Sequence, residues 1–334
     1  MTKGDKNFIM DLGATKTNVP TFETDVTLVR KIKNSLGVIQ DNKLLLFAPF
    51  SLNRAFTGIH YTIFKHDCKI MDVTFILAND MFSENPYYEN SIGYPTSTMI
   101  LFYDAALNFY ILDATKQIIQ CQFKISDNDR VISFCGSSVK PNEFIVLTPT
   151  DICIYNVDSE IADQIFSTPF RARRIIPFGP YYTLLSNDEV TVFDGVNLKK
   201  YFQGDEIESF VISDDDIIIS RNDPSHGTTQ SSIFEKISNG TVKSAIGLKK
   251  VYDNLWDAAN GWIVTMVRTG SLAIGNINYP KARALIKTET QIELPKWLFA
   301  GIIKHDNALG VVVIGSNKLE TYQVPLDSLN KLIE

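Results

Sequence analysis

The segment Pro149-Thr-Asp-Ile-Cys-Ile-Tyr-Asn-Val157 gives the clearest indication of how this chain folds. Turn residues open it, and apolar side chains then alternate with other residues. Because the apolar run Phe144–Leu147 comes just before the turn, the two runs predict a β-hairpin. The same pattern recurs at 103–113, 187–194, 269–276 and 316–324. Hairpins that repeat every few tens of residues are typical of radial β architectures, so we expect an all-β fold.

Most of the apolar runs group in fours, as the strands of small antiparallel sheets would. Four strands each are predicted within 130–166, 173–202, 206–246 and 250–294, and two less regular groups within 26–66 and 68–124. The last group, 297–324, supplies only three strands. Closed propellers commonly pair a strand from one terminus with the sheet at the other, and Phe8–Leu12 is well placed to do so. We predict a seven-bladed β-propeller over residues 1–325, with six or eight blades, a β-sandwich and two stacked β domains as alternatives.

The C-terminal residues follow a different pattern. Leu326, Leu329, Leu332 and Ile333 recur at helical spacing, and Asp327 stands near the start of the segment. We expect a short amphipathic helix within 326–334, which either caps the propeller or begins a helical extension of a longer chain.

The repeat pattern resembles the WD-repeat-like β-propeller superfamily over nearly the whole chain, in architecture and not in motif. No Gly-His opens a blade. The positions where that family places Trp-Asp carry Leu112-Asp113, Val157-Asp158, Phe193-Asp194, Asn276-Ile277 and Gln323-Val324. Trp256-Asp257 falls at the end of a predicted first strand, and we interpret it as a coincidence. We therefore do not expect the Asp–His–Ser–Trp network of the family, and expect apolar packing between sheets to hold the blades together.

Composition narrows the class of protein. The chain has 334 residues, 45% hydrophobic content and a net charge of -6, which indicate a folded protein with a sizeable core. The acidic total disfavours a bulk nucleic-acid binder, because such domains are usually strongly basic. A membrane-spanning helix needs about 18 consecutive apolar residues, and no run in the sequence approaches that length. Residues 1–8 are too polar for a signal peptide. We expect a cytoplasmic or nuclear protein.

We expect neither a metal site nor a disulfide framework. The four cysteines, Cys68, Cys121, Cys135 and Cys153, have no Cys-x-x-Cys spacing. His60, His66 and Cys68 form a His-x5-His-x-Cys pattern, but six extended residues place the two histidines about 20 Å apart. The nucleophile-elbow, metalloprotease, P-loop and dinucleotide motifs are absent from the sequence. The predicted blade starts also supply no consistent set of acidic or histidine residues for a propeller hydrolase.

One short segment favours a different activity. Residues 8–18 are similar to the first phosphate motif of sugar kinases in the actin-like ATPase superfamily. The resemblance implies that Asp11 would manage a metal ion, and that Gly13, Thr15 and Thr17 would lie at the phosphates. However, Pro20 disfavours the strand that must follow, and the long helices and glycine-rich adenosine motif of that family are not found. We keep this sugar-kinase activity, and a propeller hydrolase or ligand binder, as alternatives.

The longest irregular segment, 79–97, is a candidate partner-docking loop. Long loops in compact domains are often functional. This one contains Phe82, Tyr87, Tyr88 and Tyr94, and tyrosine is enriched at interface hot spots. The alternative is that these rings pack back onto the propeller.

Basic residues form a second candidate surface. Arg171, Arg173 and Arg174 enter one predicted blade, and Lys249 and Lys250 begin the blade after next. Because corresponding blade positions lie on one face of a propeller, we expect a shared basic rim. Such a rim suits an acidic or phosphorylated peptide, lipid headgroups or RNA.

These patterns predict a non-catalytic protein-interaction scaffold that uses no cofactor. A propeller followed by a helix is the layout of many subunits of coats, tethers, pores and chromatin-type complexes, so we expect a subunit or N-terminal domain of a larger assembly. A rigid fold would hold the loop and the rim at fixed geometry, which limits the ordering entropy lost on binding a partner.

Overall fold

The computed structural model describes residues 15–17, 25–32, 35–47, 61–76, 99–114, 116–125, 130–137, 140, 142–157, 162–168, 171–213, 216–222, 231–249, 256–267, 271–287, 297–304, 308–315 and 319–334. The chain divides into two compact units. The four-sheet unit comprises residues 24–51 and 59–204, and the three-sheet unit comprises residues 1–23, 52–58 and 205–334.

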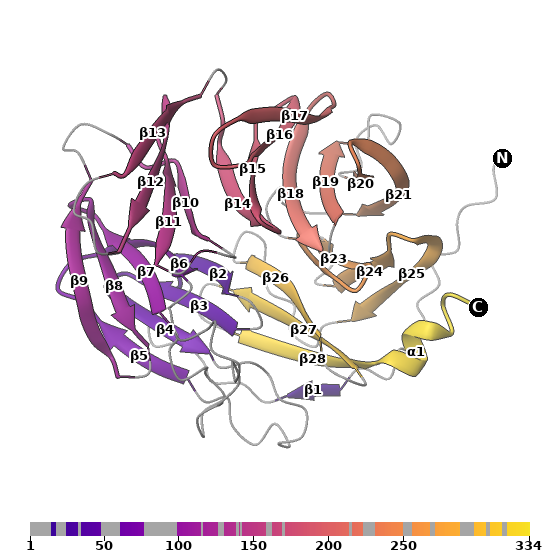
Figure 1. Cartoon of the computed structure of the whole chain (residues 1–334). Helices are drawn as coiled ribbons and strands as arrows, with labels where there is room; N and C mark the ends of the chain where they lie inside the picture. The colour runs from indigo at the N-terminus through magenta and orange to yellow at the C-terminus, as the bar shows by residue number, and fades with distance from the viewer. Residues whose placement is uncertain are drawn as a thin grey trace, which may run out of the picture. The chain divides into compact units, whose positions relative to one another are not determined.

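The four-sheet unit consists of consecutive four-stranded antiparallel sheets (Figure 1). Its strands are β2 (Leu28–Ile32), β3 (Ser35–Gln40), β4 (Lys43–Phe47) and β5 (Tyr61–Lys65); β6 (Ile70–Ile76), β7 (Met99–Asp104), β8 (Asn108–Asp113) and β9 (Ile118–Lys124); β10 (Ser133–Gly136), β11 (Glu143–Leu147), β12 (Asp151–Asn156) and β13 (Gln164–Ser167); and β14 (Arg174–Phe178), β15 (Tyr181–Leu185), β16 (Glu189–Phe193) and β17 (Leu198–Gln203). The first strands of successive sheets, β2, β6, β10 and β14, contact one another in that order.

The three-sheet unit follows the same plan. Its strands are β18 (Ile207–Ser213), β19 (Asp216–Asn222), β20 (Ser231–Ser238) and β21 (Thr241–Lys249); β22 (Trp256–Ala259), β23 (Trp262–Val267), β24 (Ser271–Asn276) and β25 (Tyr279–Lys287); and β26 (Trp297–Lys304), β27 (Ala308–Gly315) and β28 (Leu319–Pro325), joined by the N-terminal β1 (Thr15–Thr17). Here too the first strands β18, β22 and β26 contact in order.

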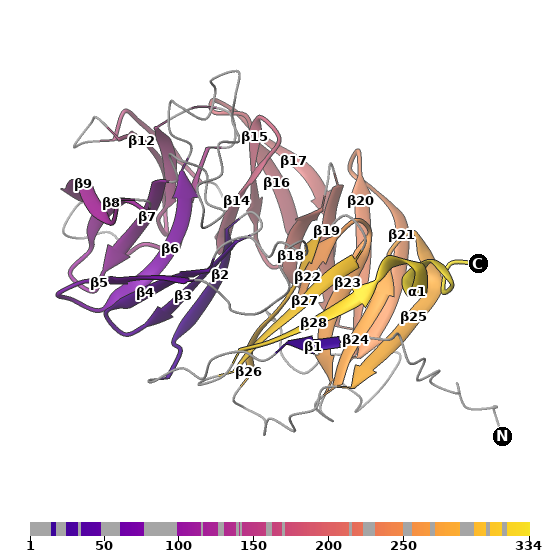
Figure 2. The same ribbon diagram turned by 90° about the horizontal axis from the view of Figure 1, so that it is seen from below.

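Seven four-stranded sheets in chain order, the last completed by a strand from the other terminus, are the topology of a seven-bladed β-propeller. The predicted all-β class and blade number are therefore confirmed. The predicted N-terminal closing strand is also present, but its residues differ. Thr15, Lys16 and Thr17 pair antiparallel with Gln323, Tyr322 and Thr321, and β1 lies beside β28 in Figure 2. The predicted segment Phe8–Leu12 lies outside the described residues.

The hairpin turns explain much of this regularity. Asn239-Gly240 and Asn260-Gly261 each have positive φ at both residues, from 50° to 75°. This is the backbone of a type I′ turn, whose twist matches that of the paired strands, and Asn-Gly is its preferred sequence. At Asn239-Gly240 the turn joins β20 to β21, with Ser238 paired to Thr241.

The core lies between neighbouring sheets, as the sequence predicts. One cluster packs Phe109 of β8 against Phe144 of β11, and both side chains are fully buried. Phe123 and Tyr155 extend the aromatic contacts, with the rings of Phe144 and Tyr155 stacked 5.2 Å apart. Replacing such a buried ring by alanine typically costs about 3–5 kcal/mol. Apolar packing between sheets thus supplies the cohesion of successive blades.

The sheet predicted within 250–294 is present, but the bounds of its strands differ from the prediction. Its first strand, expected to end at Trp256, is described as β22 from Trp256 to Ala259, and its last strand is β25 (Tyr279–Lys287). Asp257 is buried in β22, and its Oδ2 accepts a hydrogen bond from the backbone N–H of Ile302 in β26 across 3.1 Å. The carboxylate of Asp257 therefore joins two first strands. This structural role does not make Trp256-Asp257 a family motif, because the pair lies in a first strand.

The C-terminal helix is α1 (Leu326–Asn330). Leu329 is fully buried in the cluster between the last two sheets of the three-sheet unit, and Leu326, Leu332 and Ile333 pack against it. The apolar spacing thus produces a cap on these sheets. Among the described residues, no helix has the length and apolar character needed to cross a membrane.

Candidate functional site

The connectors into the first strands of the four-sheet unit gather at one end of its sheets. Because neighbouring strands are antiparallel, each first strand begins where the turn between the second and third strands lies. Backbone hydrogen bonds tie the two kinds of segment together, from Ala105 N–H to Lys69 O and from His66 N–H to Asn42 O. We call this the connector end; its described segments include 66–69, 105–107, 130–132 and 171–173.

Asp104 organises the turn between β7 and β8. Its side chain is 1% exposed. Oδ1 accepts hydrogen bonds from the backbone N–H groups of Ala106 and Asn108, at 2.9 and 3.0 Å. Oδ2 accepts one from the Tyr110 hydroxyl at 2.9 Å. These bonds let the turn form without glycine, although Leu107 adopts a φ of 63°.

His66 is held close to this carboxylate. Besides the bond from its N–H to Asn42, its carbonyl accepts from Asn42 Nδ2 at 2.8 Å. Its ring lies 4.5 Å from the Tyr110 ring and 5.4 Å from the Phe102 ring, edge-on in both cases. The side chain is 9% exposed, and Nε2 lies 3.5 Å from Asp104 Oδ2.

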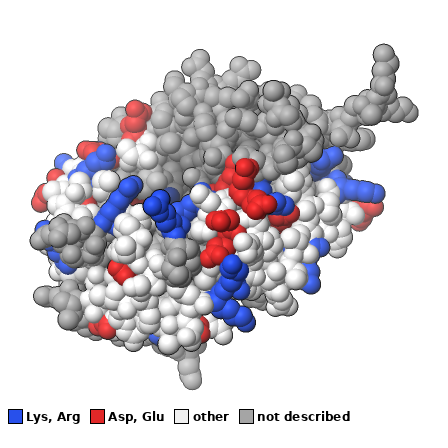
Figure 3. Space-filling model, turned by 90° about the horizontal axis from the view of Figure 1, so that it is seen from above, with Lys and Arg blue, Asp and Glu red and all other residues white. Residues whose placement is uncertain are grey.

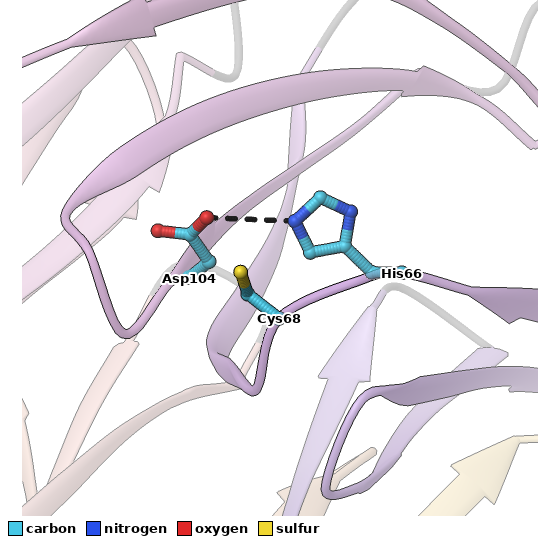
Figure 4. Close-up of side chains that lie close together, drawn as sticks. All are labelled: His66, Cys68 and Asp104. Carbon is cyan, nitrogen blue, oxygen red and sulfur yellow. Dashed lines mark hydrogen bonds and ion pairs between the residues drawn. The ribbon is translucent and has the colours of Figure 1, made fainter.

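Cys68 completes a cluster of three potential ligands. One atom from each of His66, Cys68 and Asp104 falls within 4.8 Å of the other two. Figure 4 shows the thiol, the imidazole and the carboxylate pointing toward one another. Cys68 is exposed, so the cluster is open to solvent on that side.

Hydrogen bonding decides the protonation state of Asp104. Burial alone would raise the pKa of this carboxyl, but the Asn108 N–H, the Tyr110 hydroxyl and the Ala106 N–H together hold it below its usual value. Burial, followed by the bond to Asp104, raises the pKa of Tyr110 to about 12. At neutral pH the pair is therefore a carboxylate anion and a neutral hydroxyl donor.

A hollow of about 270 Å³ lies beside the cluster, lined by Met71, Tyr103, Asp104, Ala105, Leu107, Arg130 and Val131. It joins the start of β6, the turn after β7 and the connector into β10. Met71 is 41% exposed and Arg130 is also exposed. The hollow therefore offers apolar surface beside one cation.

The predicted arginines lie on the next connector. Arg171 and Arg173 are exposed, whereas Ala172 between them is buried in the cluster that joins the β10 and β14 sheets. This alternation directs the two arginines to the solvent side, and Arg174 at the start of β14 is half-buried. On the face in Figure 3, lysine and arginine side chains form separate groups with acidic side chains between them. On this face, charge of either sign is therefore arranged in local groups.

Other predicted site residues are not placed by the structure. Phe82, Tyr87, Tyr88 and Tyr94 of the 79–97 loop lie outside the described residues, as does Lys250. Lys249 ends β21 of the three-sheet unit, and its side chain is also outside the described part. Of the kinase-like motif, Thr15 and Thr17 belong to β1, and α1 is the one α-helix among the described residues.

Sequence reasoning missed Asp104 and Tyr110. It considered His66 only with Cys68 and with His60, which lies outside the described residues, and rejected a joint metal site, whereas the structure brings His66 to Asp104. The signal was present as an aspartate at a strand end followed by Ala-Ala-Leu-Asn, a turn that needs an internal acceptor. We did not expect the family's Asp–His–Ser–Trp network; one His–Asp pair is nevertheless present, with Tyr110 bonded to the aspartate.

Comparison with known proteins adds no identity to this architecture. No family model matches the chain, and no curated protein sequence matches it either.

Proposed function

We propose that this protein is a non-catalytic interaction module whose connector end binds an acidic segment of a partner protein. One observation carries the proposal: three exposed arginines, Arg130, Arg171 and Arg173, lie on the connectors into β10 and β14, two strands in contact. Guanidinium groups bind carboxylates with paired, charge-assisted hydrogen bonds, so this arrangement suits aspartate and glutamate side chains.

The adjacent hollow defines the rest of the recognised segment. At about 270 Å³ it is slightly smaller than typical small-molecule pockets of about 300–1,000 Å³, and it fits one or two side chains of a bound peptide. Met71 and Leu107 supply apolar contact there, and Arg130 supplies the cation. The partner segment would therefore carry an apolar side chain flanked by carboxylates.

The same surface suits a subunit of a larger protein assembly. Strands of packed sheets support the connectors, so the free protein already holds the arginines near their binding positions and loses little entropy on association. The 79–97 loop would add a second docking element. Assembly into a coat, tether, pore or chromatin-type complex remains part of this proposal.

The proposal is tested by selecting peptides from a random displayed library on the purified chain. Selected peptides should be enriched in Asp and Glu around an apolar residue. Reversing the charges in Arg130→Glu, Arg171→Glu and Arg173→Glu together should weaken their binding by at least about ten-fold, or 1.4 kcal/mol.

A matched variant controls for the change in net charge. Lys199→Glu, Lys281→Glu and Arg283→Glu reverse three exposed cations on the outer strands β17 and β25 and should leave binding unchanged. Peptides without acidic enrichment, or equal binding by both triple variants, would reject the proposal. Selective binding of RNA or of anionic vesicles in place of acidic peptides would reject it as well.

A further inference from the structure

We propose that His66, Cys68 and Asp104 form a binding site for a divalent transition-metal ion of the zinc class. The ligand atoms would be Nε2, Sγ and a carboxylate oxygen, which lie within 4.8 Å of one another (Figure 4). None of the three arginines proposed to bind a partner is a ligand of this site, although Asp104 also lines the hollow beside Arg130.

The spacing between His66 and Asp104 suits a shared ion better than a direct hydrogen bond. Nε2 and Oδ2 are 3.5 Å apart, beyond the usual range of about 2.7–3.2 Å for an N–H···O bond. Zinc binds nitrogen and oxygen at about 2.0–2.2 Å, so two ligands of a tetrahedral ion lie about 3.4 Å apart. The two side chains therefore already have the separation of neighbouring ligands.

The third ligand needs only a small adjustment. Zinc binds sulfur at about 2.3 Å, which puts Sγ about 3.6 Å from the other two ligand atoms of a tetrahedral ion. Because all three atoms already lie within 4.8 Å of one another, Sγ has to approach the other two by no more than about 1.2 Å. Cys68 is exposed in the connector between β5 and β6, where the neighbouring Asp67 and Lys69 are exposed as well. A change of side-chain rotamer is therefore open to it.

The surroundings orient the two buried ligands, as outer-shell contacts do in metal sites. Tyr110 and the turn N–H groups fix the Asp104 carboxylate, and Asn42 fixes the backbone of His66. A set of one nitrogen, one sulfur and one oxygen selects zinc-like ions over magnesium and calcium, which prefer oxygen alone. Three protein ligands leave the fourth to solvent or to a partner molecule.

Cobalt(II) titration of the chelator-treated chain tests the site, because cobalt reports thiolate ligation spectroscopically. We expect one ion per chain, with a thiolate-to-cobalt charge-transfer band that zinc abolishes by displacement. Cys68→Ser should remove the band and weaken metal binding by at least about ten-fold. The control is Asp67→Asn, an exposed carboxylate in the same connector, which should leave both unchanged.

A second measurement needs no variant. Zinc should slow alkylation of Cys68 in the native chain at least about ten-fold, and a chelator should restore the rate. Absence of the charge-transfer band, equal affinities for the wild type and Cys68→Ser, or a labelling rate that ignores zinc would each overturn the proposal.

Discussion

Tyr182 links two neighbouring sheets through the hydrogen bonds of its hydroxyl group. Its hydroxyl, on β15, donates to Glu143 Oε1 on β11 across 2.8 Å. Burial raises the pKa of Tyr182 above its usual value. A hydrogen bond with Ser137 lowers this pKa, and the Glu143 carboxylate raises it further. The folded protein therefore holds this tyrosine neutral, as a donor to a carboxylate.

This predicts a specific dependence of stability on pH. An unfolded tyrosine ionises near pH 10. Because the native pKa is higher, the stabilising contribution of Tyr182 is fully present below about pH 10 and is lost as the pH rises above it. Between about pH 9.5 and 11 the free energy of unfolding should fall less steeply in Tyr182→Phe than in the wild type.

Urea unfolding at several pH values measures this difference. At neutral pH, Tyr182→Phe should cost about 1–3 kcal/mol, because it removes a hydrogen bond to a charged group. Tyr181→Phe alters an exposed neighbour and should stay within about 0.5 kcal/mol of the wild type. Parallel pH profiles for the wild type and Tyr182→Phe would contradict the assignment.

For single residues, the sequence predicts which side chains are exposed to solvent better than it predicts which side chains contact each other. The exposed positions of Arg171 and Arg173 follow from their place at a strand start. The pairing of His66 with Asp104 does not, because it joins a connector to a turn 38 residues later. Such pairs depend on how the second sheet packs on the first. The local pattern of apolar and polar residues does not encode this packing.

Among the strands, β10 and β6 approach each other unusually closely. A Cβ atom built on Gly136 of β10 would lie 2.0 Å from the backbone oxygen of Phe75 and 2.8 Å from Cα of Ile76. Only glycine fits there without moving one of the two backbones. The close contact of these first strands thus depends on one residue.

Gly136→Ala should therefore destabilise the four-sheet unit by about 1–3 kcal/mol through overpacking. Gly247→Ala in β21 is the matched control, because a Cβ there would meet nothing within 4 Å. Thermal and urea unfolding should show the loss in the first variant, and little change or a slight gain in the second. Equal stability of the two variants would show that β10 and β6 are further apart.

Strand positions followed well from hydrophobic periodicity, and the exception has a physical reason. The strand β22 carries Asp257 in its buried face, a position that pattern rules read as the end of a strand. The residue is accommodated because the N–H of Ile302, a strand of the next sheet, supplies its hydrogen bond. A buried carboxylate that accepts a hydrogen bond from a distant strand is invisible to local periodicity.

At the scale of the whole molecule, the count of strands predicted both the seven sheets and the need for an N-terminal strand. It did not predict which residues supply that strand. The sequence favoured segment 8–12 because it is apolar. Residues 15–17, however, pair with β28 through backbone hydrogen bonds, which do not require an apolar sequence. The missing fourth strand of the last sheet therefore predicted N-terminal closure correctly, whereas apolar composition did not identify the residues that form the closing strand.

Closure by β1 is the central claim about this architecture, and engineered disulfides test its register. In a Cys68→Ser, Cys121→Ser background, Thr17→Cys and Thr321→Cys would face each other, since these residues are direct partners. Opposite Cβ atoms in an antiparallel pair lie about 4.5–5.5 Å apart, close enough to bridge after a small adjustment. Lys16→Cys with Thr321→Cys is the control, because alternation puts these side chains on opposite faces.

The decisive measurement is the yield of the intramolecular cross-link after mild oxidation, read by peptide mass mapping. Pairing of β1 with β28 predicts a high yield for the 17–321 pair and little for the 16–321 pair. Failure of the 17–321 pair to form, or equal yields for both pairs, would contradict a propeller closed by its own N-terminal strand.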